Sequence, residues 1–277
     1  MRTDMSAVIT NRTSELSRLV RHDLSRDATA LPELPRSAAE AMRIARAAVL
    51  DLDAAARLAE RDPPLTARIL AVANSALFAR GGRHVSPRRA IAHIGGAALR
   101  DVLYQAAYAS MVFEVPRYAA EVSRDFVHGV ATAALSRALA RVARADPEDA
   151  FLAGLLHDIG RARCWASIAR RANGLCDDDA LFVVDALHAA AGHGLLRAWQ
   201  LPPEIADVCM HHHAGSPHEL VAVVAAADAL MHAAEHRADL RAPIDLLSAI
   251  GVDATGVLAW LQRAEGELVR ARLMTGA

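Results

Sequence analysis

A His-Asp pair, His157-Asp158, stands between the apolar run Leu155-Leu156 and the dipeptide Ile159-Gly160. Further His and Asp residues lie at wide intervals around this pair, each in an apolar, helix-like context: His128, His188, His212, His213 and Asp228. Neutral imidazole and carboxylate groups together hold Fe, Mn, Zn or Ni in proteins. The pattern therefore predicts a metal site gathered from several helices.

The wide spacing of these candidates suits a site inside a helical bundle. Each gap leaves room for a helix and a turn, so several helices can each contribute ligands. Adjacent helical residues project about 100° apart, so His157 and Asp158 can share one metal only if their helix runs alongside it. The pair His212-His213 would present the same geometry from a second helix.

A simpler interpretation is that these histidines are core residues, with a structural metal or none. The chain holds 13 histidines, and His22-Asp23 shows that the dipeptide also arises by chance. His193 lies five residues after His188, on a different helical face, so at most one should face a common site. His232 shares a face with Asp228 and could stand behind it, although an exposed or structural role ranks first. The remaining histidines lack a suitable partner pattern and are interpreted as surface or capping residues: His84, His93, His211, His218 and His236.

The amino-acid composition limits the fold classes and the kinds of partner that this chain can have. The chain has 277 residues, 53% of them hydrophobic and only 4% aromatic, which favours closely packed helices. The net charge of −1 argues against a nucleic-acid or membrane partner. All 31 basic residues are arginine, so a single arginine is weak support for phosphate recognition. Three cysteines without CxxC spacing suit reduced thiols, and no signal peptide or long apolar run is found, so we expect a cytoplasmic protein.

Helix punctuation recurs along the chain and indicates an all-α fold. Asp62-Pro63 and Asp146-Pro147 both have the pattern of an N-cap followed by a first-turn proline. Apolar residues recur at helical spacing between such starts, and the sequence contains no convincing strand or hairpin signal. The second of these helices should carry Phe151 to Asp158 and break at Gly160.

The breaks divide the chain into three parts. Residues 1–30 form an Arg-rich helical leader, residues 31–236 form the main domain, and residues 237–277 form a helical extension. Within the main domain, an N-terminal lobe over 31–115 precedes a lobe over 117–236 that holds every candidate ligand.

Several separate stretches resemble one known family, the HDOD domain. Four are similar to its first half: Leu31–Pro35, Glu60–Thr66, Ala73–Leu77 and Ser86–Gly95. Three are similar to its second half: Gly154–Gly160, Trp199–Pro202 and His212-His213. They follow in the family's order over about residues 30–236, so the resemblance implies a multi-helix bundle with an N-terminal helical lobe and a C-terminal HD-like lobe.

The resemblance also implies a ligand set, because the HDOD family is similar to the HD superfamily of metal-dependent phosphohydrolases. The HD-type quartet corresponds to His128, His157, Asp158 and Asp228. The additional histidines of a multinuclear site like that of the HD-GYP cyclic-di-GMP phosphodiesterases correspond to His188, His212 and His213. The implied cofactor is one or two divalent ions, Fe, Mn or Ni. In such a site Asp158 would bridge two ions and Arg161 would contact a phosphate.

Two departures weigh against a cyclic-di-GMP phosphodiesterase. Ala214–Pro217 stands where a Gly-Tyr-Pro loop would follow the paired histidines, and Arg161 replaces the expected lysine. We therefore predict a signal-transduction or regulatory protein with a metal-binding HD-like site and a protein partner. The alternative is a metal-dependent phosphohydrolase that acts on a nucleotide or cyclic dinucleotide.

Overall fold

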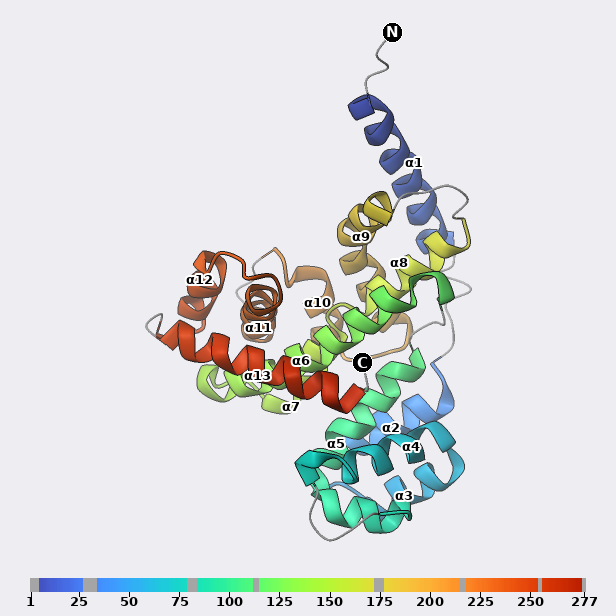
Figure 1. The fold of residues 1–277 in the computed structure, drawn as a ribbon, viewed down its shortest axis with the longest axis vertical. Helices are drawn as coiled ribbons and strands as arrows, with labels where there is room; N and C mark the ends of the chain where they lie inside the picture. The colour runs from blue at the N-terminus through green and yellow to red at the C-terminus, as the bar shows by residue number, and fades with distance from the viewer. Residues whose placement is uncertain are drawn as a thin grey trace. The chain divides into compact units, whose positions relative to one another are not determined.

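The computed structural model describes residues 5–26, 34–78, 84–111, 115–171, 177–214, 218–253 and 256–275. Within these ranges every regular element is a helix and no strand is found, which confirms the predicted all-α fold. The chain divides into two compact units (Figure 1). The N-terminal unit contains helices α2 to α5, and the C-terminal unit contains α1, α6 to α12 and most of α13.

The N-terminal unit is a small helical cluster in which α2 and α4 pack against the long helix α5. Asp62 caps α4 as predicted, since its carboxylate accepts a hydrogen bond from the Leu65 amide at 2.9 Å. Helix α5 contains a kink at Gly95, whose φ of 77° is readily adopted only by glycine. The elements are α2 (Arg36–Arg46), α3 (Leu52–Arg61), α4 (Pro63–Ala73), the short 3-10 helix η1 (Ala76–Phe78) and α5 (Pro87–Met111).

The C-terminal unit is built from paired helices. Its most extensive pairings are α6 with α7, α8 with α9, and α11 with α6. Within the residues that the structure describes, no helix combines the length and hydrophobicity needed to cross a membrane. The elements are α1 (Met5–Arg26), η2 (Pro116–Tyr118), α6 (Ala119–Ala143), α7 (Pro147–Leu156), α8 (Ile159–Ala169), α9 (Asp177–Ala198), α10 (Pro203–His211), α11 (Glu219–His236), α12 (Arg241–Ala249) and α13 (Val257–Thr275).

Helix α7 begins with a cap that can be tested directly. The Asp146 carboxylate accepts hydrogen bonds from the amides of Glu148 and Asp149 at 2.8 and 2.9 Å. We expect Asp146→Ala to lower the free energy of unfolding by about 1 kcal/mol in urea denaturation. Asp146→Asn is the matched control, because asparagine also caps well; an equal loss in both variants would contradict the capping role.

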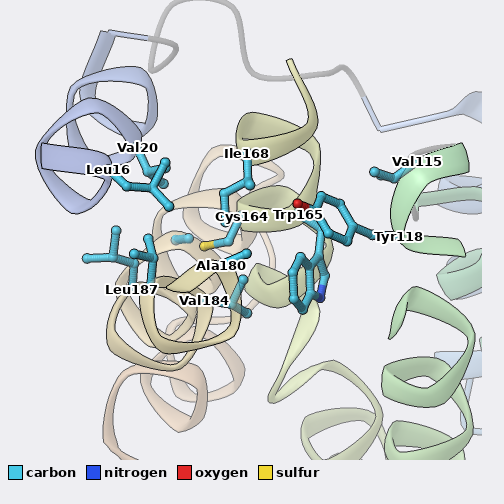
Figure 2. Packing of buried hydrophobic residues seen from close by; sticks show 12 residues of the cluster. Leu16, Val20, Val115, Tyr118, Cys164, Trp165, Ile168, Ala180, Val184 and Leu187 are labelled. Atoms are coloured by element: carbon cyan, nitrogen blue, oxygen red, sulfur yellow. The ribbon is translucent and has the colours of Figure 1, made fainter. Parts of the chain in front are cut away.

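One apolar cluster joins α1 to the helices that lead into the candidate site. Figure 2 shows Leu16 and Val20 of α1 facing Leu187 of α9 and Ile168 of α8. On the other side of the cluster the rings of Tyr118 and Trp165 pack with centroids 4.6 Å apart. The burial of these side chains fixes α8 and α9 relative to each other.

Polar contacts also hold α1. Asp23 accepts a hydrogen bond from the Ser167 hydroxyl at 2.7 Å and is paired with the Arg171 guanidinium. These contacts tie α1 to Ser167 of α8 and to Arg171 just beyond its end. Helix α1 is therefore an integral part of the C-terminal unit.

Two of the cysteines are sealed inside this unit. Burial raises the pKa of the Cys164 thiol to about 12 and raises the pKa of Cys209 well above its ordinary value. Because only thiolates react readily, we expect neither to react with Ellman's reagent at pH 8 until the protein is unfolded. The measurement uses Cys176→Ser protein; rapid labelling of the native variant would show that the unit opens readily.

Candidate metal centre

The His157-Asp158 pair lies in the turn between α7 and α8. Helix α7 ends at Leu156 and α8 begins at Ile159, so the predicted helix stops just before the pair. Gly160 lies inside α8, and the prediction that it breaks a helix is wrong. The break relaxes the fixed angle between adjacent helical side chains, so both can turn inward.

Gly160 instead permits a close approach of two helices. A Cβ at this position would lie 2.0 Å from the carbonyl oxygen of His188 and 2.4 Å from the amide nitrogen of Gly192. The start of α8 therefore rests directly on the α9 backbone. This approach brings Asp158 to His188, with 3.2 Å between Oδ1 and Nε2.

A first group of candidate ligands surrounds Oδ1 of Asp158. The His212 Nε2 lies 3.5 Å from it, and the Nε2 atoms of His188 and His213 lie 3.2 Å apart. One potential ligand atom from each of the four residues falls within 4.8 Å of the others. The group draws on the turn before α8, on α9 and on the residues that follow α10.

A second group lies on the other side of Asp158. Asp228 on α11 places Oδ1 3.0 Å from His128 Nε2 and 3.6 Å from His157 Nε2. His157 Nε2 is in turn 3.7 Å from Oδ2 of Asp158. The fold thus brings all seven predicted ligands together in two groups that share Asp158.

Backbone carbonyls orient three of the imidazoles. Nδ1 of His157 donates to the Gly154 carbonyl at 2.8 Å, and Nδ1 of His212 donates to the Cys209 carbonyl at 2.9 Å. Nδ1 of His188 makes the same contact with the Asp185 carbonyl at 2.9 Å. A proton fixed on Nδ1 leaves the Nε2 lone pair aimed at the centre, as in metal-binding histidines.

Unsatisfied inner atoms provide a test of fit for a metal. Within the described residues, His157 Nε2, His212 Nε2 and Asp158 Oδ1 are buried without a hydrogen-bond partner. Such atoms cost free energy unless something binds them. Two imidazole nitrogens about 2.1 Å from one ion at right angles would be about 3.0 Å apart, close to the 3.2 Å between His188 and His213. The residues therefore fit a divalent metal.

The charge states of the two carboxyls and of His213 suit metal binding, whereas neighbouring carboxylates outweigh burial and raise the pKa of His128 and His212, so an ion would compete with a proton at these two imidazoles. Burial opposes ionisation of Asp158 and Asp228, but neighbouring histidines outweigh it and hold the pKa of both carboxyls well below the ordinary value. Burial, assisted by the nearby His212, lowers the pKa of His213 to about 4. Ionised carboxylates and neutral imidazoles are the forms that bind metals.

The sequence model of the HDOD domain matches residues 31–215. The protein belongs to the HDOD family. This confirms the resemblance for fold and family, while an HD-GYP-like pattern remains a prediction. No match was found among curated proteins.

Solved HDOD-like structures share the fold. A structure from Shewanella amazonensis, provisionally named a metal-dependent phosphohydrolase, is 20% identical with a TM-score of 0.65, covering 93% of this chain and 99% of its own. An HDOD domain protein of unknown function from Geobacter sulfurreducens is 21% identical with a TM-score of 0.63. The match covers 90% of this chain and 96% of the Geobacter chain. A Marinobacter aquaeolei structure, provisionally named a signal transduction protein, is 18% identical with a TM-score of 0.65. The match covers 95% of this chain and 68% of the Marinobacter chain.

Arg161 of this HDOD protein is held by carboxylates. Its Nε donates to Asp125 at 2.9 Å and its Nη1 to Asp185 at 2.8 Å, while Nε is 3.9 Å from Asp158. Asp125 is fixed in turn by the Trp165 indole, which donates to it at 3.0 Å. The guanidinium thus contributes positive charge beside Asp158, and a phosphate contact stays a prediction.

Sequence reasoning missed part of the surroundings of the HDOD centre. Glu235 accepts a hydrogen bond from His128 Nδ1 at 3.0 Å, and His232 Nε2 lies 3.3 Å from Asp228 Oδ1. The i+4 spacing of His232 from Asp228 already indicated a shared face, although an exposed or structural role ranked first, whereas Glu235 was missed; its i+7 spacing on the same helical face is the signal that could have found it. His193 is directed elsewhere, with its Nε2 3.5 Å from Asp207.

Proposed function

We propose that this HDOD protein is a signal-transduction module whose C-terminal unit carries a divalent metal centre. The observation that most directly supports this proposal is that ligand-type atoms of His157, Asp158 and His212 are buried without a hydrogen-bond partner in the described part of the chain. Seven imidazole and carboxylate side chains from three helices and two connecting segments converge there. If no ligand bound there, burying these polar groups would lower the free energy of unfolding.

The proposed ligands fall into two sets. His188, His212 and His213 with Asp158 would hold one ion, and His128, His157 and Asp228 would hold another. Imidazole with carboxylate favours Fe, Mn, Ni or Zn over Mg, and we propose Fe, Mn or Ni in one or two equivalents. A bound divalent ion supplies positive charge and lowers the pKa of water.

Elemental analysis of protein purified without a histidine tag tests this proposal. The wild type, after anaerobic reconstitution with Fe²⁺, Mn²⁺ or Ni²⁺, should retain one to two equivalents through gel filtration, and Asp158→Asn should retain fewer than about 0.2. His22→Gln, an exposed histidine of α1, is the matched control and should retain wild-type content. Wild-type protein without metal under all these conditions would overturn the proposal.

A metal-dependent phosphohydrolase is the second candidate. The specific observation is that the two oxygens of Asp158 face different groups, Oδ1 toward His188 and Oδ2 toward His157. A carboxylate placed in this way can serve two ions, and paired ions clamp a transferring phosphoryl group. The relative from Shewanella amazonensis carries a phosphohydrolase name, which supports the same candidate.

The test is turnover by metal-reconstituted protein of a panel of nucleotides, cyclic dinucleotides and bis(p-nitrophenyl) phosphate. Hydrolysis that disappears in Asp158→Asn and persists in His22→Gln would support an enzyme. Absence of hydrolysis by fully loaded protein would remove this candidate while leaving the metal-binding module intact.

A protein partner remains part of the proposal for the signalling role. The described residues of the N-terminal unit contribute no candidate ligand, and we propose that this unit makes such a contact. Affinity capture with intact protein, metal-loaded and metal-free, should retain a specific protein in a metal-dependent manner. Retention of no specific protein in either form would count against the signalling role.

A further inference from the structure

Helix α11 carries a second set of ligand-type side chains beyond Asp228. His232, Glu235 and His236 occupy its last turns, and one potential ligand atom from each lies within 4.8 Å of the others. Both histidines are exposed, whereas the Glu235 side chain is only 15% exposed. None of these three residues belongs to the seven ligands of the proposed centre.

The spacing of these residues suits coordination. His232 and His236 are four residues apart, which places both rings on one face of the helix. Their centroids are 5.9 Å apart and their planes differ by 24°, so the rings lie side by side. Two histidines at this helical spacing are a known arrangement for binding zinc.

Two contacts tie this set to the core. Glu235 Oε2 bonds His128 Nδ1 at 3.0 Å, which anchors its carboxylate beside the two histidines. His232 Nε2 lies 3.3 Å from Asp228 Oδ1, and its ring centroid is 5.0 Å from that of His128. The carboxylate is thus held in place, and one of the two imidazoles is already packed against buried groups.

We infer that His232, Glu235 and His236 form an additional divalent cation site on the exposed face of α11. Imidazole and carboxylate ligands suit borderline ions such as Zn²⁺, Ni²⁺ and Co²⁺. Because two of its three ligands are exposed, this site exchanges its ion with solvent faster than the enclosed centre does. The inference does not depend on the proposed function, since these three residues can bind an ion whether or not the core is loaded.

The test compares Ni²⁺ binding by wild type and His236→Gln, using calorimetric titration at pH 7.5 for the additional site and elemental analysis after gel filtration for the core, because the additional site gives up its ion on the column. Within the described residues, His236 packs against His232 and shares no ligand group with the seven core residues, so its removal should leave the core content unchanged. We expect the variant to lose one equivalent of Ni²⁺, or to bind it at least 10-fold more weakly. His22→Gln is the control and should match the wild type.

Crossing this change with Asp158→Asn separates the two sites. In the Asp158→Asn background, His236→Gln should still remove one equivalent of Ni²⁺. That result would support the additional site even if the core held no metal. Equal Ni²⁺ binding with and without His236, in both backgrounds, would overturn the inference, as would an equal loss on changing His22.

Discussion

Gly160→Ala is expected to destabilise the C-terminal unit by about 1–3 kcal/mol or more, because its Cβ would overlap backbone atoms that cannot rotate away. The added carbon would lie 2.0 Å from the His188 carbonyl oxygen and 2.4 Å from the Gly192 nitrogen. Helices α8 and α9 would have to separate. Asp158 and His188 would move apart with them, so metal content should fall together with stability.

Gly194→Ala provides the matched control, on α9 itself. An added Cβ there meets nothing within 4 Å, so the exchange should stabilise the helix by about 0.5–1 kcal/mol. Urea denaturation and elemental analysis of both variants measure the two effects. Wild-type stability in Gly160→Ala would show that α8 does not rest on α9 as closely as described.

Asp228→Asn should remove one ion and leave the other. Among the proposed ligands, Asp228 lies nearest to His128 and His157, at 3.0 and 3.6 Å, and farther from His213, at 3.9 Å, whereas His188 and His212 contact Asp158. The amide is almost the same size as the carboxylate but lacks its charge, and so it is a poor metal ligand. Asp158→Asn should instead empty both positions, because its carboxylate lies between the groups.

Metal content per protein, measured after reconstitution, distinguishes these outcomes. For a wild type with two equivalents, we expect about one in Asp228→Asn and fewer than about 0.2 in Asp158→Asn. Equal losses in both variants would show that the two groups act as a single site. Circular dichroism on the same samples verifies that the helical fold is retained.

Local signals made much of the fold predictable. A capping aspartate followed by proline specifies a helix start within a few residues, so Asp62 and Asp146 marked α4 and α7 correctly. The role of Gly160 was not local. A glycine that ends a helix and one that admits a neighbouring backbone look alike in sequence, and only the position of α9 separates them.

In the candidate site, too, some features were predictable from local sequence and others depended on tertiary packing. The apolar surroundings of the His and Asp residues pointed to a metal site, and the resemblance to the HDOD family implied the seven side chains that the fold brings together. The partners that orient them could not be selected in this way, since Glu235 meets His128 from 107 residues away and Asp125 meets Arg161 from 36. Tertiary packing alone creates such pairs.

The packing of α1 shows that the folded C-terminal unit begins earlier in the chain than the family match does. The family match begins at residue 31, yet Leu16 and Val20 are buried against α8 and α9. A shortened protein that begins at the family boundary would therefore turn an apolar face toward water and tend to self-associate. If such a fragment formed oligomers, the cause would be the loss of α1, and the oligomers would not represent the assembly state of the full chain.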